Sequence, residues 1–352
     1  ALDRRARFSI ISAAVATFLV AVPAAVLVLE ADPIPAEPPP SPRPDTRYWE
    51  LSTGSRIAYS AFRADDPLAD RNPIVFLHNP DRAVLDTDIA FFRQFSEEGF
   101  SVYLYDLVGC GLSGRLDDIT AYTIARHVED LEAIRETIEA DRLILIGHAG
   151  GSEIAARYMV AHRDRVQSAI FYSPTPLWSD EEYATDETRT AALSSGEPAS
   201  ILALPALGIR PIVAAAIAVH SPRTAQAYVP QEEMIAWANQ TVNEGAMVCA
   251  GELESAPQPA SPGYNPYVGI VTGVTANQTN DPRPLLSELL VPTILLRGEC
   301  DPVDPAVVSQ YQEAIPYLQV YYVEEAGSML HLARPDAVKR TILTLLRKER
   351  EG

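Results

Sequence analysis

One stretch of nine residues restricts the fold of this chain more than any other. An apolar run at Leu143–Ile146 ends in Gly-His-Ala-Gly-Gly at residues 147–151, and a helical pattern follows. This order predicts a buried strand, a sharp turn and then a helix. The turn forces residue 149 into a strained backbone conformation, and the glycines beside it avoid side-chain clashes. Residue 149 itself is alanine.

Strand and helix patterns alternate on both sides of this stretch, which predicts an α/β fold with a doubly wound, mostly parallel sheet. A hairpin around Gly54 begins it, and a helical pattern follows at residues 88–98. Residues 175–285 lack a strong strand pattern and predict a helical cap inserted into the sheet. The core is therefore expected in two parts, residues 47–174 and residues 286–352. Further strands are expected at residues 73–78, 101–105, 143–148, 166–172, 291–296 and 318–323, and further helices at 122–140, 151–161 and 335–347.

The N-terminal region predicts a membrane anchor. Phe8–Leu29 carries no charge, and as a helix it would reach about 33 Å, enough for a hydrocarbon core of about 30 Å. Arginines precede this segment and acidic residues follow it, so we expect residues 1–30 to span the membrane once, with a cytoplasmic N-terminus and an extracytoplasmic main domain, periplasmic or at the cell surface. A cleaved signal peptide is the rival interpretation.

The next segment, residues 31–46, contains seven prolines. It predicts an extended, semi-rigid tether that lifts the main domain off the membrane.

Charge and cysteine content narrow the functions further. A net charge of −19 argues against nucleic-acid binding, which calls for a basic surface. The three cysteines fit no metal pattern, and we expect neither a metal nor a cofactor. Cys249 and Cys300 could pair outside the cell, whereas Cys110 is expected to be a small buried residue.

Five motifs follow one another along the chain: His78-Asn79, Asp106 through Gly114, the turn at residues 147–151, the turn at Gly298 and Asp301, and Ala326-Gly327. In this order they resemble the α/β-hydrolase superfamily, in particular its bacterial proline-iminopeptidase-like and esterase-like members. The resemblance covers residues 47 to about 349 and implies the α/β-hydrolase fold. It also implies a Ser-His-Asp triad and an oxyanion hole of backbone amides.

Mapped onto this sequence, the resemblance implies Asp301 as the acid and the backbone amides of Asn79 and Gly150 as oxyanion donors. The nucleophile position falls on Ala149, and the histidine position falls on Ser328. Two of the three triad side chains are therefore replaced. His331, three residues beyond the histidine position, is a candidate substitute base.

These replacements favour a membrane-anchored, hydrolase-like protein without conventional hydrolytic activity. It would serve as a binding or accessory subunit, with an apolar small molecule or a membrane protein as its partner. Loss of one triad member lowers turnover by a factor on the order of 10⁶, and loss of a second lowers it little further. Once the first residue is lost, catalysis therefore no longer requires the second. The alternative is a cell-envelope serine esterase or aminopeptidase whose nucleophile is disabled. A non-hydrolytic reaction such as an isomerisation is a third interpretation.

Overall fold

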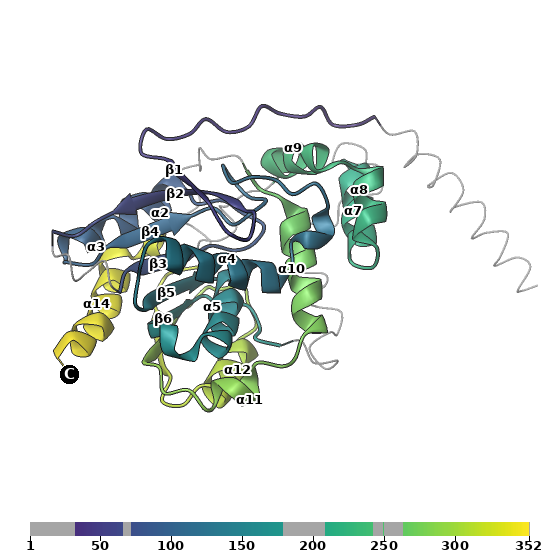
Figure 1. Cartoon of the computed structure of the whole chain (residues 1–352). Coiled ribbons are helices and arrows are strands. Elements are labelled where there is room, and N and C mark those ends of the chain that lie inside the picture. The colour runs from purple at the N-terminus through teal and green to yellow at the C-terminus, as the bar shows by residue number, and fades with distance from the viewer. Residues whose placement is uncertain (1–31, 66–71, 179–207, 242–248, 250–262, 352) are drawn as a thin grey trace, which may run out of the picture.

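The computed structural model describes residues 32–65, 72–178, 208–241, 249 and 263–351 (Figure 1). Within these residues, one eight-stranded sheet has the order β1-β2-β4-β3-β5-β6-β7-β8. Strand β2 is antiparallel to both of its neighbours, and all the other pairs are parallel. The strands are β1 (Arg47–Glu50), β2 (Arg56–Phe62), β3 (Ile74–Leu77), β4 (Val102–Tyr105), β5 (Leu143–His148), β6 (Val166–Tyr172), β7 (Thr293–Gly298) and β8 (Gln319–Val323).

Helices follow most of the parallel strands, as a doubly wound sheet requires. They are α2 (Asp86–Phe92), α3 (Gln94–Glu97), η2 (Ile119–Ala121), α4 (Ile124–Thr137), α5 (Gly150–Ala161), η3 (Arg163–Arg165), α7 (Ile209–Ala218), α8 (Pro222–Tyr228), α9 (Gln231–Thr241), α10 (Pro266–Gln278), α11 (Arg283–Leu286), α12 (Ala306–Ala314), α13 (Leu330–Ala333) and α14 (Pro335–Glu351). Between β6 and β7, the described residues form only helices α7 to α11 and loops.

Two apolar clusters hold the layers together, one on each face of the sheet. Alternate residues of β3 and β5 enter opposite clusters, as the two-residue period of a strand requires. One cluster joins the sheet to α2, α3 and α14, and the other joins it to α4, α5 and α12. The C-terminal ends of β5, β6 and β7 therefore lie at one edge of a rigid, two-sided core, where the predicted site residues follow them.

The doubly wound sheet and its opening hairpin are confirmed, with Arg47 paired to Tyr59. The helical pattern expected at residues 88–98 is present as two short helices, α2 and α3, which are separated at Arg93. Around Arg93 the hydrogen bonds change to i→i+3, as in the 3.0 Å bond from the Ser96 amide to the Arg93 carbonyl. Such bonds tighten the turn and interrupt a regular α-helix.

The strap, which we define as residues 32–46, runs along the domain surface (Figure 1). It is extended and forms no helix or strand, as predicted. It does not stand free as a spacer, however, because the Ile34 amide donates to Glu233 at 3.4 Å and Arg43 pairs with Asp86 at 2.5 Å. Proline fixes φ in the unfolded chain too, so docking this segment loses little further entropy.

The predicted membrane span, residues 8–29, lies outside the described residues. Among the helices that the structure describes, none is both long enough and apolar enough to cross a membrane.

Candidate active site

The turn between β5 and α5 has the strained geometry that its sequence predicts. The backbone of Ala149 has φ 50° and ψ −120°, a conformation that residues other than glycine rarely adopt. A methyl group added at Gly147 would stand 2.6 Å from the Cα atom of Ser152, so only glycine fits there. The Ala149 amide donates to the Tyr172 carbonyl at 3.0 Å and fixes the turn against the end of β6. The tip of this turn carries only a methyl group.

The predicted oxyanion donor at Gly150 is already engaged. Its amide donates to Asn79 Oδ1 at 2.9 Å. The amide group of Asn79 is oriented by a second bond, because Asn79 Nδ2 donates to Asp81 Oδ1 at 2.5 Å. Asn79 Oδ1 thus accepts the hydrogen bond of the Gly150 amide that the oxyanion of a reaction intermediate would otherwise accept. The sequence predicted the Asn79 backbone as a donor and did not predict this role for its side chain.

His78 shapes the loop that presents Asn79. Its Nδ1 atom donates to the Asn79 carbonyl at 2.7 Å, and its Nε2 atom accepts from the Leu107 amide at 2.9 Å. Burial lowers the pKa of His78 to about 4, against the raising effect of the Asn79 carbonyl. The ring is therefore neutral at physiological pH and links the loops after β3 and β4.

The predicted acid, Asp301, follows β7 and is buried. Its Oδ1 atom accepts from the Val303 amide at 3.0 Å, whereas no hydrogen bond within the described residues reaches Oδ2. Burial raises the pKa of Asp301, while the Val303 amide, Arg297 and the nearby Ser173 hydroxyl lower it. In a complete triad the second carboxylate oxygen would accept a proton-bearing histidine nitrogen.

The predicted histidine position, Ser328, is half-buried and lies in the turn after β8. Its backbone lies beside the His148 ring. Burial drives the pKa of His148 well below its usual value, against a small raising effect of the Ser328 backbone. The turns after β5 and β8 therefore meet, as the mapping requires, but a hydroxyl stands where the base would be.

The candidate substitute base, His331, is fixed within a buried polar network. Its Nδ1 atom lies 2.7 Å from Tyr172 Oη, and its Nε2 atom lies 3.2 Å from Asp88 Oδ1. Asp88 in turn pairs with Arg82 at 2.7 Å. Burial opposes the charge on Asp88, but Arg82 and His331 outweigh it and hold the pKa of this carboxyl well below its usual range. His331 would have to give up both ring contacts to act as a base. This network could not be predicted from the sequence, because Arg82 and Asp88 lie in a loop and a helix start without a recognisable motif.

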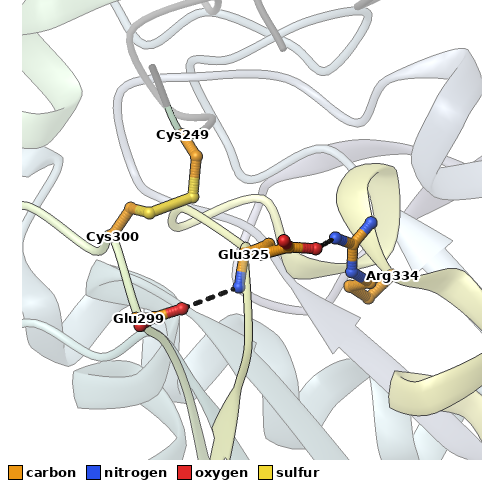
Figure 2. Close-up of a disulfide and its surroundings, with 5 residues drawn as sticks. All are labelled: Cys249, Glu299, Cys300, Glu325 and Arg334. Carbon is orange, nitrogen blue, oxygen red and sulfur yellow. Dashed lines mark hydrogen bonds and ion pairs between the residues drawn. A yellow bond between two sulfur atoms is a disulfide. The ribbon is translucent and has the colours of Figure 1, made fainter. Parts of the chain in front are cut away.

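A disulfide and a chain of polar contacts fasten the acid turn (Figure 2). Cys300, directly before Asp301, is bonded to Cys249, so the pairing left open by the sequence occurs. The neighbouring Glu299 accepts from the Glu325 amide at 3.0 Å, and Glu325 pairs with Arg334. The turns after β7 and β8 are therefore held together, with the third cysteine, Cys110, buried elsewhere.

An open cavity of about 460 Å³ adjoins the acid turn. Carboxylates at Glu299, Asp301 and Glu324 share its lining with the Tyr322 ring. Among the residues that the structure describes, no group of three or more histidines, cysteines or acidic residues is placed to hold a metal ion.

Comparison with known proteins agrees with this geometry. A family model described as alpha/beta hydrolase fold matches residues 72–195. This chain has the α/β-hydrolase fold. Solved structures in the same superfold include a thermophilic esterase from Thermogutta terrifontis, with a TM-score of 0.57 and 17% identity over 86% of this chain and 98% of that one. A bromoperoxidase from Bacillus anthracis gives a TM-score of 0.56 and 17% identity over 86% of this chain and 99% of that one.

Proteins similar in sequence to part of this chain include proline iminopeptidases. The enzyme of Heyndrickxia coagulans is 31% identical over 133 residues, which is 37% of this chain and 44% of that protein. The enzyme of Saccharolobus solfataricus is 31% identical over 121 residues, covering 34% of this chain and 38% of that protein. The matched part thus spans less than half the length of each relative.

Proposed function

We propose that this α/β-hydrolase-like protein lacks conventional hydrolytic activity and serves as a membrane-anchored binding or accessory subunit. The observation that carries the proposal is the hydrogen bond from the Gly150 amide to Asn79 Oδ1, beside an alanine at the nucleophile position. Nucleophile, base position and oxyanion donor are then all compromised. These three functions belong to different parts of the fold. A change that restores one of them therefore leaves the other two defective.

The retained elbow is consistent with a structural role for the turn. Gly147 and Gly151 allow α5 to pack against β3 and β5 at backbone contact distance, and larger residues would force these elements apart. The strained turn at Ala149 therefore supports the core without any chemistry at its tip.

The disulfide supports an extracytoplasmic main domain. Disulfides persist in oxidising compartments and are rare in the cytosol. Cys249–Cys300 agrees in this respect with the topology expected from residues 1–30. The partner we propose is an apolar small molecule or a membrane protein that contacts the cap.

A second candidate function is a serine aminopeptidase or esterase of the cell envelope, seen here without its nucleophile. Two observations favour it: proline iminopeptidases are among the relatives, and Ala149 keeps a φ of 50° that an active nucleophile would also need.

One series of variants separates the two candidates. The unmodified chain, Ala149→Ser with Ser328→His, and the same pair with Asn79→Gly are assayed on an aryl ester and a prolyl anilide. We expect no turnover from the unmodified chain and little from the double variant, because Asn79 still occupies the Gly150 amide. The triple variant should gain roughly 10²–10³ in kcat over the double variant, the value of one oxyanion donor.

The matched control is Asn79→Gly alone, which should remain inactive because it still lacks a nucleophile. Circular dichroism checks that each variant folds. Turnover by the unmodified chain that Asp301→Asn abolishes would refute the proposal. Full activity of the double variant, with no gain from Asn79→Gly, would favour the disabled enzyme.

A further inference from the structure

Helix α7 is apolar on all sides. Its sequence is Ile-Arg-Pro-Ile-Val-Ala-Ala-Ala-Ile-Ala, and its one charged residue, Arg210, pairs with Glu233 at 2.9 Å. Pro211, Ala214 and Ala218 form its buried side. A helix that is apolar all round is normally covered on every side, so its other face calls for a partner.

That other face is only partly covered. Ile209, Ile212, Val213 and Ala216 recur at helical spacing and are half-buried or exposed, and Val219, directly after the helix, is 37% exposed. None of them belongs to the two apolar clusters of the described core. We call these five residues the outer face of α7.

The chain enters the described structure beside this helix (Figure 1). The Ile34 amide donates to Glu233 of α9, and a methyl group at Gly208, the N-cap of α7, would stand 3.2 Å from Ile34 Cδ1. The uncharged segment Phe8–Leu29 ends five residues before Ile34. Five residues reach at most roughly 18 Å, so a membrane span at residues 8–29 would have to end within that distance of Ile34.

We propose that the outer face of α7 rests in the interfacial region of the bilayer that residues 8–29 cross. This inference rests on the anchor in the proposed function. An apolar helix face buries shallowly at the boundary between headgroups and acyl chains. From Ile209 to Pro222 the chain carries Arg210 as its only Asp, Glu, Lys or Arg, and Glu233 neutralises it. Because the net charge of −19 opposes contact with anionic lipids, we assign the partner as a zwitterionic membrane surface.

The test uses tryptophan reporters in the full chain, reconstituted in phosphatidylcholine vesicles with brominated acyl chains. Val213→Trp reports on α7, Phe18→Trp reports on the anchor, and Glu97→Trp on α3 is the control on the other side of the molecule (Figure 1). The background replaces the native tryptophans by phenylalanine at Trp49, Trp178 and Trp237.

We expect the brominated chains to quench the reporters at positions 213 and 18 and to leave position 97 unchanged. Quenching at 18 without quenching at 213 would overturn the inference and leave the anchor standing. If neither is quenched, the anchor itself fails. The reporter at position 213 could also be shielded from aqueous iodide without being quenched by the brominated lipid. A second copy of the chain or residues 179–207 would then cover the outer face of α7, and this result would also overturn the inference.

Discussion

At the scale of single residues, Glu153 is a largely buried carboxyl group that lies outside the predicted triad. It lies in the first turn of α5 and pairs with Arg157 at 3.1 Å. Burial raises the pKa of Glu153 to about 7, against the lowering effect of Arg157. The folded state therefore binds a proton more tightly than the unfolded chain at this site, and stability falls as pH rises from about 4.5 to about 7.

We predict that Glu153→Gln removes a pH-dependent loss of stability on the order of 3 kcal/mol, since one pKa unit corresponds to about 1.4 kcal/mol. Urea unfolding at pH 5 and pH 8 measures it. The unmodified chain should lose more stability over this interval than the variant. Glu129→Gln, which removes the same charge from an exposed position of α4, is the control and should leave the pH dependence unchanged. Equal pH dependence in all three proteins would show that Glu153 ionises normally.

Residue identities at the site could be predicted from the sequence, but side-chain directions could not. The motif places Ala149, Asp301 and Ser328 at the ends of their strands because strand order and turn length fix the backbone there. The direction of the Asn79 amide depends instead on Asp81 and on the Gly150 amide, two groups 2 and 71 residues away.

At the scale of elements, Asp88 fastens the start of α2. Its carboxylate accepts from the Leu85 amide at 2.9 Å and pairs with Arg82, which is 1% exposed. The same carboxylate lies beside His331 of α13. One buried charge thus joins two helices and a loop.

We predict that Asp88→Asn destabilises the fold by about 3–5 kcal/mol, because it leaves the Arg82 guanidinium buried without its counter-charge. Chemical denaturation measures the free energy of unfolding. The matched control is Asp86→Asn on the same helix, whose exposed pair with Arg43 should contribute about 1 kcal/mol or less. Similar losses for both variants would show that the buried pair is not the stronger contact.

The strands could be predicted from the sequence more closely than the strap could. Strands such as β5 are buried on both faces and therefore read as continuous apolar runs. The strap has the composition of a free linker, and its partners Glu233 and Asp86 lie 199 and 43 residues away from Ile34 and Arg43. A local sequence pattern cannot reveal contacts between residues that are so far apart in the chain.

At the scale of the whole molecule, the Cys249–Cys300 disulfide closes a loop over a sequence separation of 51 residues. It joins the inserted region to the turn of the predicted acid. Sequence spacing left this pairing open, because two cysteines 51 residues apart meet only if the fold brings them together.

We predict that Cys249→Ser with Cys300→Ser lowers the free energy of unfolding by about 4 kcal/mol, the chain-entropy value for a loop of this length. Denaturation of both proteins without reductant measures the difference. Adding a dithiol should bring the unmodified chain to the stability of the variant and leave the variant unchanged. A variant as stable as the oxidised chain would contradict the prediction.

The course of the strap has a mechanical consequence. A pull on the N-terminal side of residue 32 meets the strap before it meets β1, because residues 32–46 lie along the surface through separate contacts at Ile34, Glu37 and Arg43. These contacts open one after another, at low force, and release slack of at most roughly 50 Å. The contacts of the strap therefore break before the sheet is loaded. The edge strand β1 bears the pulling force only after the whole strap has detached from the surface.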